Sequence, residues 1–247
     1  MSRTAGTCQA FERALASLGA GASLQAQEVD RLRPLCRRLE SWPAGSLMEA
    51  PLRTDRVRLI TSGWICEARL LADGRRQIFG YLLPGDLICS RHARRASANV
   101  LLALTHVELV EVPAMLAALA DERRKEVSEG LSRSIERQED RSYDALLRVG
   151  AYTAVERVAH LMLEFRERLM RVGLATAHSF PLPLTQEHLA DTLGLSAVHV
   201  SRVLKQLRSE GILNLSFGVV TMLEPESLRR LAAGSALRPR TRRGDRH

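Results

Sequence analysis

Hydroxyl, imidazole and basic side chains recur at helical spacing within Thr185–Gly211, which reads TQEHLADTLGLSAVHVSRVLKQLRSEG. Hydroxyl groups and backbone N–H groups hydrogen-bond phosphate oxygens, and a guanidinium group forms paired hydrogen bonds with the edge of guanine. No GxSxG, Walker loop, HExxH or Gly-rich dinucleotide turn appears in the sequence. These residue types therefore favour binding to a polyanion over catalysis.

Two short helices must position these side chains. We expect Thr185 to cap a helix that continues through Thr192, and Ser196 to cap a second helix over Ala197–Ser209, which Gly211 ends. The second helix would enter the major groove of a DNA duplex with its N-terminal half.

Two helices that cross closely need a small residue at their contact and a flexible residue in the turn, and both are present. Ala190 is small enough for close contact, and Gly194 can adopt the positive φ of a tight turn. The pattern predicts a helix-turn-helix unit. The apolar positions that converge on one side of it are Leu189, Leu193, Leu195, Val200, Val203 and Leu207.

Arg202 is the best candidate for a paired contact with guanine, although a solvated surface arginine is the alternative interpretation. Ser201 suits a base edge or a phosphate, and the backbone N–H of Ser196 suits a phosphate. Lys205 and Arg208 are expected at phosphates, where they carry no sequence information. The full candidate set is Thr185, Ser196, Ala197, Val198, His199, Ser201, Arg202, Lys205 and Arg208.

Beyond the helix pair, ILNL and VVTMLE flank Phe217-Gly218, and Pro225 starts a last helix. Two short strands around a turn after a helix-turn-helix predict a β-hairpin wing. The unit is therefore expected to be a winged helix-turn-helix.

The N-terminal half of the sequence has a different pattern of apolar and turn-forming residues. Between Trp42 and Val112, short apolar runs are broken by turn signals, which predicts a small β-roll. ARLLADGRRQIFGYL is expected to be a hairpin turning at Asp73-Gly74, and LLALTHVELVEV one further strand. A helix capped by Ser23 is expected before the roll.

Pro113 should open a short helix after the roll, and Asp121–Leu147 a long one. Its narrow apolar stripe, Val127, Leu131 and Ile135, suits either a bridge between domains or pairing with a second copy of the helix.

The chain has 247 residues and a net charge of +8, which favours a nucleic-acid partner. All but two of its 36 basic residues are arginines, so GC-rich coding is an alternative cause. No apolar run could span a bilayer and no signal peptide is apparent, so a cytoplasmic protein without a membrane partner is expected. Zinc, iron–sulfur and common enzyme motifs are absent, so neither a metal nor an enzymatic activity is expected.

From about Leu24 to Ala232, the order of β-roll, long helix and winged helix-turn-helix resembles the Crp/Fnr family of bacterial transcription regulators. The most specific stretches are Ser62–Asp86, Ala154–Phe165 and Leu184–Leu213. The resemblance implies an α+β fold with an N-terminal jelly-roll-like sensor domain. It also implies a homodimer joined along the central helix that binds a palindromic site on double-stranded DNA, with RNA polymerase as a further candidate partner.

The sequence departs from this family at the positions that read DNA and bind ligands. Many members have a glutamate three residues before their Ser-Arg pair, where this chain has Val198. Cyclic-nucleotide-binding members have a Gly-Glu pair and a later phosphate-binding arginine. The corresponding candidate pocket residues here are Gly85, Asp86, Arg95 and Ser97, with Ser97 at the arginine position, so the cassette is degraded.

No cofactor is therefore expected. Cyclic nucleotide and haem are the alternatives, haem because Cys89 and His92 lie where a haem-binding member has its axial ligands. The alternative function is a ligand- or haem-sensing module whose DNA head is inactive or contacts a protein. The expected organisation is a loose arm over 1–22, a β-roll sensor domain over 23–120, a dimerisation helix over 121–149, a winged helix-turn-helix over 150–233, and a disordered Arg-rich tail over 234–247.

Overall fold

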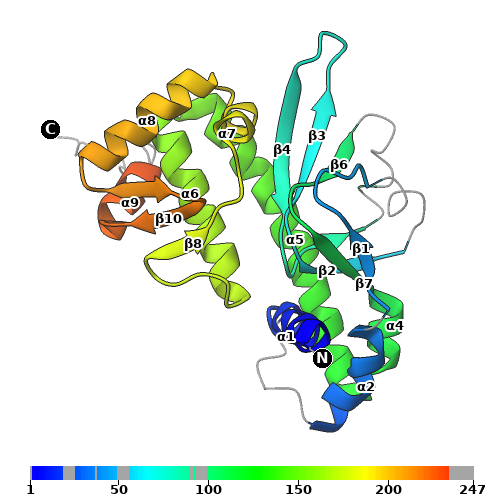
Figure 1. Ribbon diagram of the computed structural model, residues 1–247. Helices are drawn as coiled ribbons and strands as arrows, with labels where there is room; N and C mark the ends of the chain where they lie inside the picture. The colour runs from blue at the N-terminus through cyan, green and yellow to red at the C-terminus, as the bar shows by residue number, and fades with distance from the viewer. Residues whose placement is uncertain are drawn as a thin grey trace, which may run out of the picture.

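The computed structural model describes residues 2–18, 26–36, 38–48, 56–89, 92 and 99–233. Two bodies lie side by side, and the long helix α5 (Asp121–Ala151) runs from one to the other (Figure 1). One body contains the N-terminal strands, and the other contains the C-terminal helices and a small sheet. The expected α+β fold with a central helix is confirmed. No helix within the described ranges is both long and apolar enough to cross a membrane.

The N-terminal segment differs from the expected loose arm. Ser2–Ala16 forms helix α1, which buries Phe11, Ala14 and Leu15 against the roll. These residues and Leu18 share one helix face, but the surrounding Gly/Ala-rich sequence obscured the stripe. The next helix, α2 (Ala26–Cys36), lies within the region expected to be helical. Its predicted cap, Ser23, lies outside the described residues.

The β-roll consists of two antiparallel sheets. The first has the order β1-β7-β2-β5, and the second has the order β4-β3-β6. Ile60, Ile65 and Leu109 belong to a buried apolar cluster that both sheets supply. The strands are β1 (Glu40–Trp42), β2 (Arg58–Ser62), β3 (Ile65–Leu70), β4 (Arg76–Leu82), β5 (Leu87–Ile88), β6 (Val100–Ala103) and β7 (Val107–Glu111).

The predicted hairpin is present as β3 and β4, with Gly74 at φ +84° in its turn. The prediction of one strand over LLALTHVELVEV was wrong, because this segment forms β6 and β7 in different sheets. The chain turns between them without Gly or Pro. The Thr105 hydroxyl instead accepts a hydrogen bond from the backbone N–H of Trp64, at 2.9 Å.

The apolar stripe of the long helix packs inside the chain. After α4 (Val112–Ala117), α5 buries Val127 and Leu131 in the cluster that contains Phe11 of α1. A Cβ atom on Gly130 would lie 1.5 Å from the carbonyl oxygen of Leu18, so glycine permits this close approach. The stripe therefore packs within the N-terminal body, while the helix as a whole connects the two bodies, as one of the two interpretations expected.

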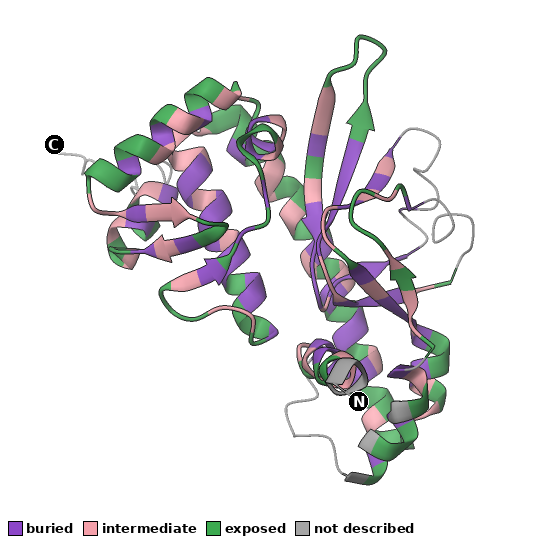
Figure 2. Cartoon of the chain, in the orientation of Figure 1, coloured by how far each residue is buried: buried purple, intermediate pink, exposed green. Residues whose placement is uncertain are grey.

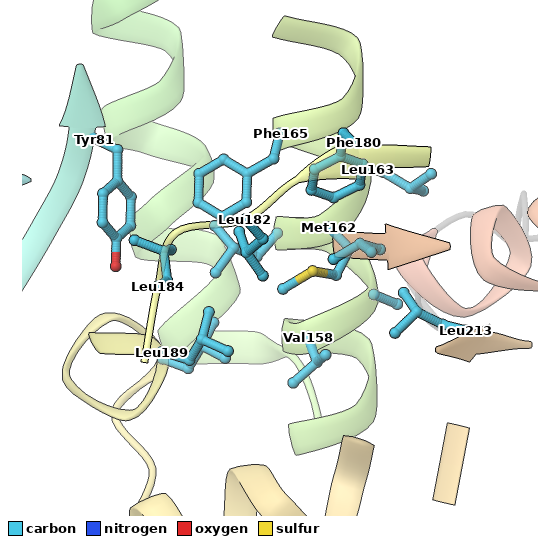
Figure 3. Packing of buried hydrophobic residues seen from close by; sticks show 14 of the residues in the cluster. Tyr81, Val158, Met162, Leu163, Phe165, Phe180, Leu182, Leu184, Leu189 and Leu213 are labelled. Atoms are coloured by element: carbon cyan, nitrogen blue, oxygen red, sulfur yellow. The ribbon is translucent and has the colours of Figure 1, made fainter. Parts of the chain in front are cut away.

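The C-terminal body has a single core. Its sheet has the order β8-β10-β9, and β8 was missed because its prolines resembled a linker. Figure 3 shows Met162, Phe165 and Leu189 among the side chains that fill this core. The elements are α6 (Ala154–Arg171), β8 (Ser179–Pro181), α7 (Gln186–Leu193), α8 (Ala197–Ser209), β9 (Leu213–Ser216), β10 (Val219–Met222) and α9 (Pro225–Ala232).

Candidate nucleic-acid interface

Helices α7 and α8 begin at the expected caps. The Thr185 hydroxyl accepts a hydrogen bond from the backbone N–H of His188 at 3.1 Å, and the His188 ring accepts one from the backbone N–H of Thr185. The Ser196 hydroxyl accepts a hydrogen bond from the backbone N–H of His199 at 3.2 Å. Each cap satisfies a backbone donor that the helix itself leaves unpaired.

The turn between the helices also agrees with the sequence. Gly194 adopts φ +62° and ends α7 in a left-handed conformation. The backbone N–H of Leu195 donates to the carbonyl oxygen of Ala190 at 3.1 Å, and Ala190 is buried. The small residue and the glycine thus hold the two helices at a fixed angle.

Helix α8 divides into a buried face and an outer face, which alternate along the ribbon in Figure 2. Val200, Val203 and Leu207 are buried in the core of the C-terminal body. The outer face brings the candidate DNA-binding residues together. Ala197 and Ser201 are half-buried, and the exposed members are Ser196, Val198, His199, Arg202, Lys205 and Arg208.

The cations on this face are available to an external anion. Within the described part of the chain, Arg202, Lys205 and Arg208 form no ion pair with a carboxylate. Exposed arginine and lysine heads remain hydrated and can exchange water for phosphate or base acceptors. Thr185, at the start of α7, is also exposed.

The C-terminal body is docked on the roll through α7. Arg76 of β4 forms an ion pair with Asp191 at 2.7 Å, and the Gln77 side chain donates to the carbonyl oxygen of Asp191. The Tyr81 hydroxyl lies 2.6 Å from the Thr192 hydroxyl. Figure 3 shows the Tyr81 ring beside Leu184, so a roll residue reaches the core of the other body.

Asp86, a candidate ligand-pocket residue, instead joins the roll to two helices. Its carboxylate accepts hydrogen bonds from Arg141 of α5 at 2.8 Å and from Arg168 of α6 at 2.6 Å. The backbone N–H of Leu83 donates to the same group. Both carboxylate oxygens are therefore occupied by protein donors. Gly85 adopts φ +89° in the adjacent turn.

A second carboxylate, Glu164, extends this network. It pairs with Arg168 at 2.7 Å and with Arg148. Burial alone raises the pKa of the Asp86 carboxyl, but the Arg141 and Arg168 charges outweigh burial and lower it below the ordinary value. The same competition, with Arg148 and Arg168 as the partners, lowers the pKa of Glu164.

The burial of these arginines was not expected, because nothing in the apolar pattern of α6 marks Arg168 as internal. The only local signal is the spacing of Glu164 and Arg168, four residues apart on one helix face. Such spacing is also typical of exposed pairs. We call the group of Asp86, Arg141, Arg148, Glu164 and Arg168 the charge node.

The other ligand candidates have mixed outcomes. Arg95 and Ser97 lie outside the described residues. Cys89 and His92 are buried, with the Cys89 sulfur 3.7 Å from the His92 Nδ1 atom. Within the described ranges, no three His, Cys, Asp or Glu side chains gather as a metal site would require.

A cavity of about 460 Å³ opens between β4, α5 and α6. Phe79, Gln138 and Leu146 contribute to its lining, and the charge-node arginines border it. The Gln138 amide nitrogen donates to the carbonyl oxygen of Leu87 at 3.1 Å. Its Oε1 atom is buried and accepts no hydrogen bond within the described part of the chain.

The geometry defines a winged helix-turn-helix protein with an attached β-roll, and comparisons with known proteins agree. Residues 156–231 match the family described as the Crp-like helix-turn-helix domain. The nitrogen fixation regulation protein FixK of Bradyrhizobium diazoefficiens is 29% identical over 85% of this chain and 88% of its own length. The transcriptional activatory protein AadR of Rhodopseudomonas palustris is 28% identical over 92% of this chain and 96% of its own.

The solved structure of FixK2 from Bradyrhizobium japonicum has the same fold, with a TM-score of 0.62 and 28% identity. The match covers 80% of this chain and 98% of that chain. Residues 156–231 therefore form a Crp-like helix-turn-helix domain, and the chain as a whole is similar to regulators of the Crp/Fnr family. It is a DNA-binding transcription regulator.

Proposed function

We propose that α8 reads the major groove through Arg202, with Ser201 at an adjacent base edge or phosphate. The observation that carries this proposal is the exposed outer face of α8, whose cations have no carboxylate partner among the described residues. Lys205 and Arg208 bind phosphates, and the α8 N-terminus at Ser196 presents backbone N–H groups to another.

Val198 would contact a different group on a base from the one that a glutamate contacts at the same position. Its exposed fraction is 61%, and its side chain neither donates nor accepts hydrogen bonds. An apolar side chain in the major groove matches the methyl group of thymine. We therefore expect a thymine, rather than a cytosine, opposite Val198.

The protein acts as a homodimer through the C-terminal half of α5. Tyr143 and Leu146 each have an exposed fraction of 72%, and Leu147 is also exposed. These residues lie three and four positions apart, so they form one apolar face on the helix. The apolar stripe in the N-terminal half of α5, Val127 and Leu131, already packs inside the same chain. The exposed face around Leu146 is therefore left for a second copy.

Sedimentation of Leu146→Glu tests the dimer. Placing a charge in the apolar face should convert the protein to a monomer at micromolar concentration, whereas Lys125→Glu, on the exposed side of the same helix, should leave the dimer intact. A dimeric Leu146→Glu protein would refute this interface.

Selection of sites from random duplex DNA with the purified dimer tests the function. The expected result is a palindrome whose half-sites are one helical turn apart, about 34–36 Å, because two symmetric heads must dock together. Absence of any enriched sequence would contradict a reading head that is active without a ligand.

The cavity supports a second role for the roll, the sensing of a small molecule. Its volume suits a compact ligand, and the unpaired Gln138 Oε1 would accept a hydrogen bond from an N–H or O–H group. A tryptophan at Ala145 would fill the space. Native mass spectrometry should then show that a molecule retained by the wild type is absent from Ala145→Trp, and identical spectra without added mass would refute this role.

A further inference from the structure

The turn of the wing has an unexpected residue at its tip. Phe217 and Gly218 join β9 to β10, and Ser216 pairs with Val219 across the hairpin. Both turn residues have positive φ, +49° and +71°. Two-residue hairpin loops of this kind favour Asn-Gly, because asparagine adopts the left-handed region at a lower energetic cost than an aromatic residue does.

Folding gives no reason for phenylalanine here. The exposed fraction of Phe217 is 103%, so its ring buries no surface against the described part of the chain. The strained backbone is therefore not offset by packing in the free protein. A large apolar side chain held in solvent on a strained turn indicates that its partner lies outside the described part of the chain.

The position of the tip indicates which partner this is. The backbone N–H of Leu182 donates to the carbonyl oxygen of Gly218 at 2.7 Å, and Val219 pairs with Pro181. This neighbouring segment leads within three residues to Thr185, the exposed cap of α7. The tip therefore lies beside the start of the helix pair that approaches DNA, within the region matched by the helix-turn-helix family.

We propose that Phe217 packs against the deoxyribose edges of the minor groove next to the segment read by α8. This inference rests on the proposed function. The ring forms no hydrogen bond with bases or phosphates, but apolar side chains are known to wedge against minor-groove sugars and base steps. Seating the ring would widen or kink the groove locally.

Two consequences distinguish this contact from phosphate binding. Removal of the ring lowers affinity without changing the salt dependence of binding, because no counterion is released by an apolar contact. Affinity also depends on the flanking sequence, since flexible TA and CA/TG steps deform more readily than A-tracts.

The test uses Phe217→Asn in the full-length protein. Asparagine suits the left-handed turn, so the variant should unfold at a melting temperature about 2–4 °C higher. Its affinity for the selected DNA site should fall roughly tenfold, the order expected when the burial of an aromatic side chain is lost, with an unchanged salt slope. The wild-type preference for a TA step over an A-tract at the flank should disappear.

Two further variants control the experiment. Phe217→Tyr keeps the ring and should keep the affinity. Leu47→Asn replaces an exposed apolar residue of the roll and should leave DNA binding unchanged.

Three outcomes would overturn the inference. If Phe217→Asn binds as tightly as the wild type while Arg202→Ala binds weakly, Phe217 does not contact the DNA, and the proposal that α8 reads the DNA is retained. A fall in the melting temperature of Phe217→Asn would show that the ring serves folding. A wild-type protein that binds no duplex would remove both this inference and the proposed function.

Discussion

The outer face of α8 and the charge node hold arginines in opposite situations. Arg202 on α8 is exposed and has no carboxylate partner in the described structure, whereas Arg168 in the node is buried and pairs with two carboxylates. The first arrangement leaves charge available to a polyanion. The second uses charge to join the roll, α5 and α6. Arginine content alone therefore does not measure DNA-binding capacity, because burial and pairing decide what each arginine does.

Breaking the node should have the largest effect on stability. Asp86→Asn removes the charge that compensates Arg141 and Arg168, which are then left buried without it. Loss of one member of a buried pair costs about 3–5 kcal/mol. Urea denaturation should show this loss of unfolding free energy.

Glu129→Gln is the matched control for that substitution. Its carboxylate pairs with Arg133 at the surface of α5, with both side chains exposed. A surface pair contributes at most about 1 kcal/mol, so the control should be nearly as stable as the wild type. Equal losses in the two variants would contradict the contrast between buried and exposed arginines.

Lowering the pH should destabilise the folded protein through the buried carboxylates of the charge node. The pKa values of Asp86 and Glu164 are lowered in the folded protein, so it binds fewer protons than the unfolded chain. The contribution of the two carboxylates to the unfolding free energy is complete above the ordinary carboxyl pKa values. It is lost as the pH falls through their lowered pKa values in the folded protein. Unfolding free energy measured from pH 7 to pH 3 should therefore fall more steeply in the wild type than in Asp86→Asn, and parallel curves would argue against the assignment.

The ion pair between the bodies should have an intermediate effect. Arg76→Ala removes the contact with Asp191, in which both side chains are partly exposed. We expect a loss of about 1 kcal/mol, and faster hydrogen exchange in α7 because the docking of that helix weakens. Arg75→Ala, which removes an exposed pair with Asp73, is the control. Unchanged exchange in α7 would show that Arg76 does not hold it.

The smallest effect is expected for a single phosphate contact. Lys205→Ala should weaken DNA binding to a similar degree for all sequences and reduce the slope of log affinity against log salt by about 1. Lys125→Ala, at the only other lysine of the chain, should leave the slope unchanged. A change of sequence preference in Lys205→Ala would mean that Lys205 contacts bases.

The reading head could be predicted from sequence because its signals are local. The caps Thr185 and Ser196 and the turn glycine Gly194 act within a few residues of their own positions, and the structure has each as expected. The charge node was not predictable in this way. Asp86 and Arg168 lie 82 positions apart, and only the assembled fold shows that they meet.

Errors in the N-terminal half have the same physical origin. At the break between β6 and β7, the Thr105 hydroxyl accepts a hydrogen bond from the backbone N–H of Trp64, 41 positions away, and no local Gly or Pro marks the turn. Helix α1 has an apolar stripe, but its burial depends on the roll that follows. The break between β6 and β7 and the burial of α1 therefore involve contacts between residues far apart in the sequence, which local patterns do not predict.

The most direct test of α8 as the reading element measures the affinity of wild type and Arg202→Ala for every single base-pair substitution of the selected site. We predict that Arg202→Ala loses about 1–3 kcal/mol on the intact site and becomes indifferent to one base pair, at the same position in both half-sites. An unchanged affinity and an unchanged pattern of base preference would show that α8 does not read DNA through Arg202.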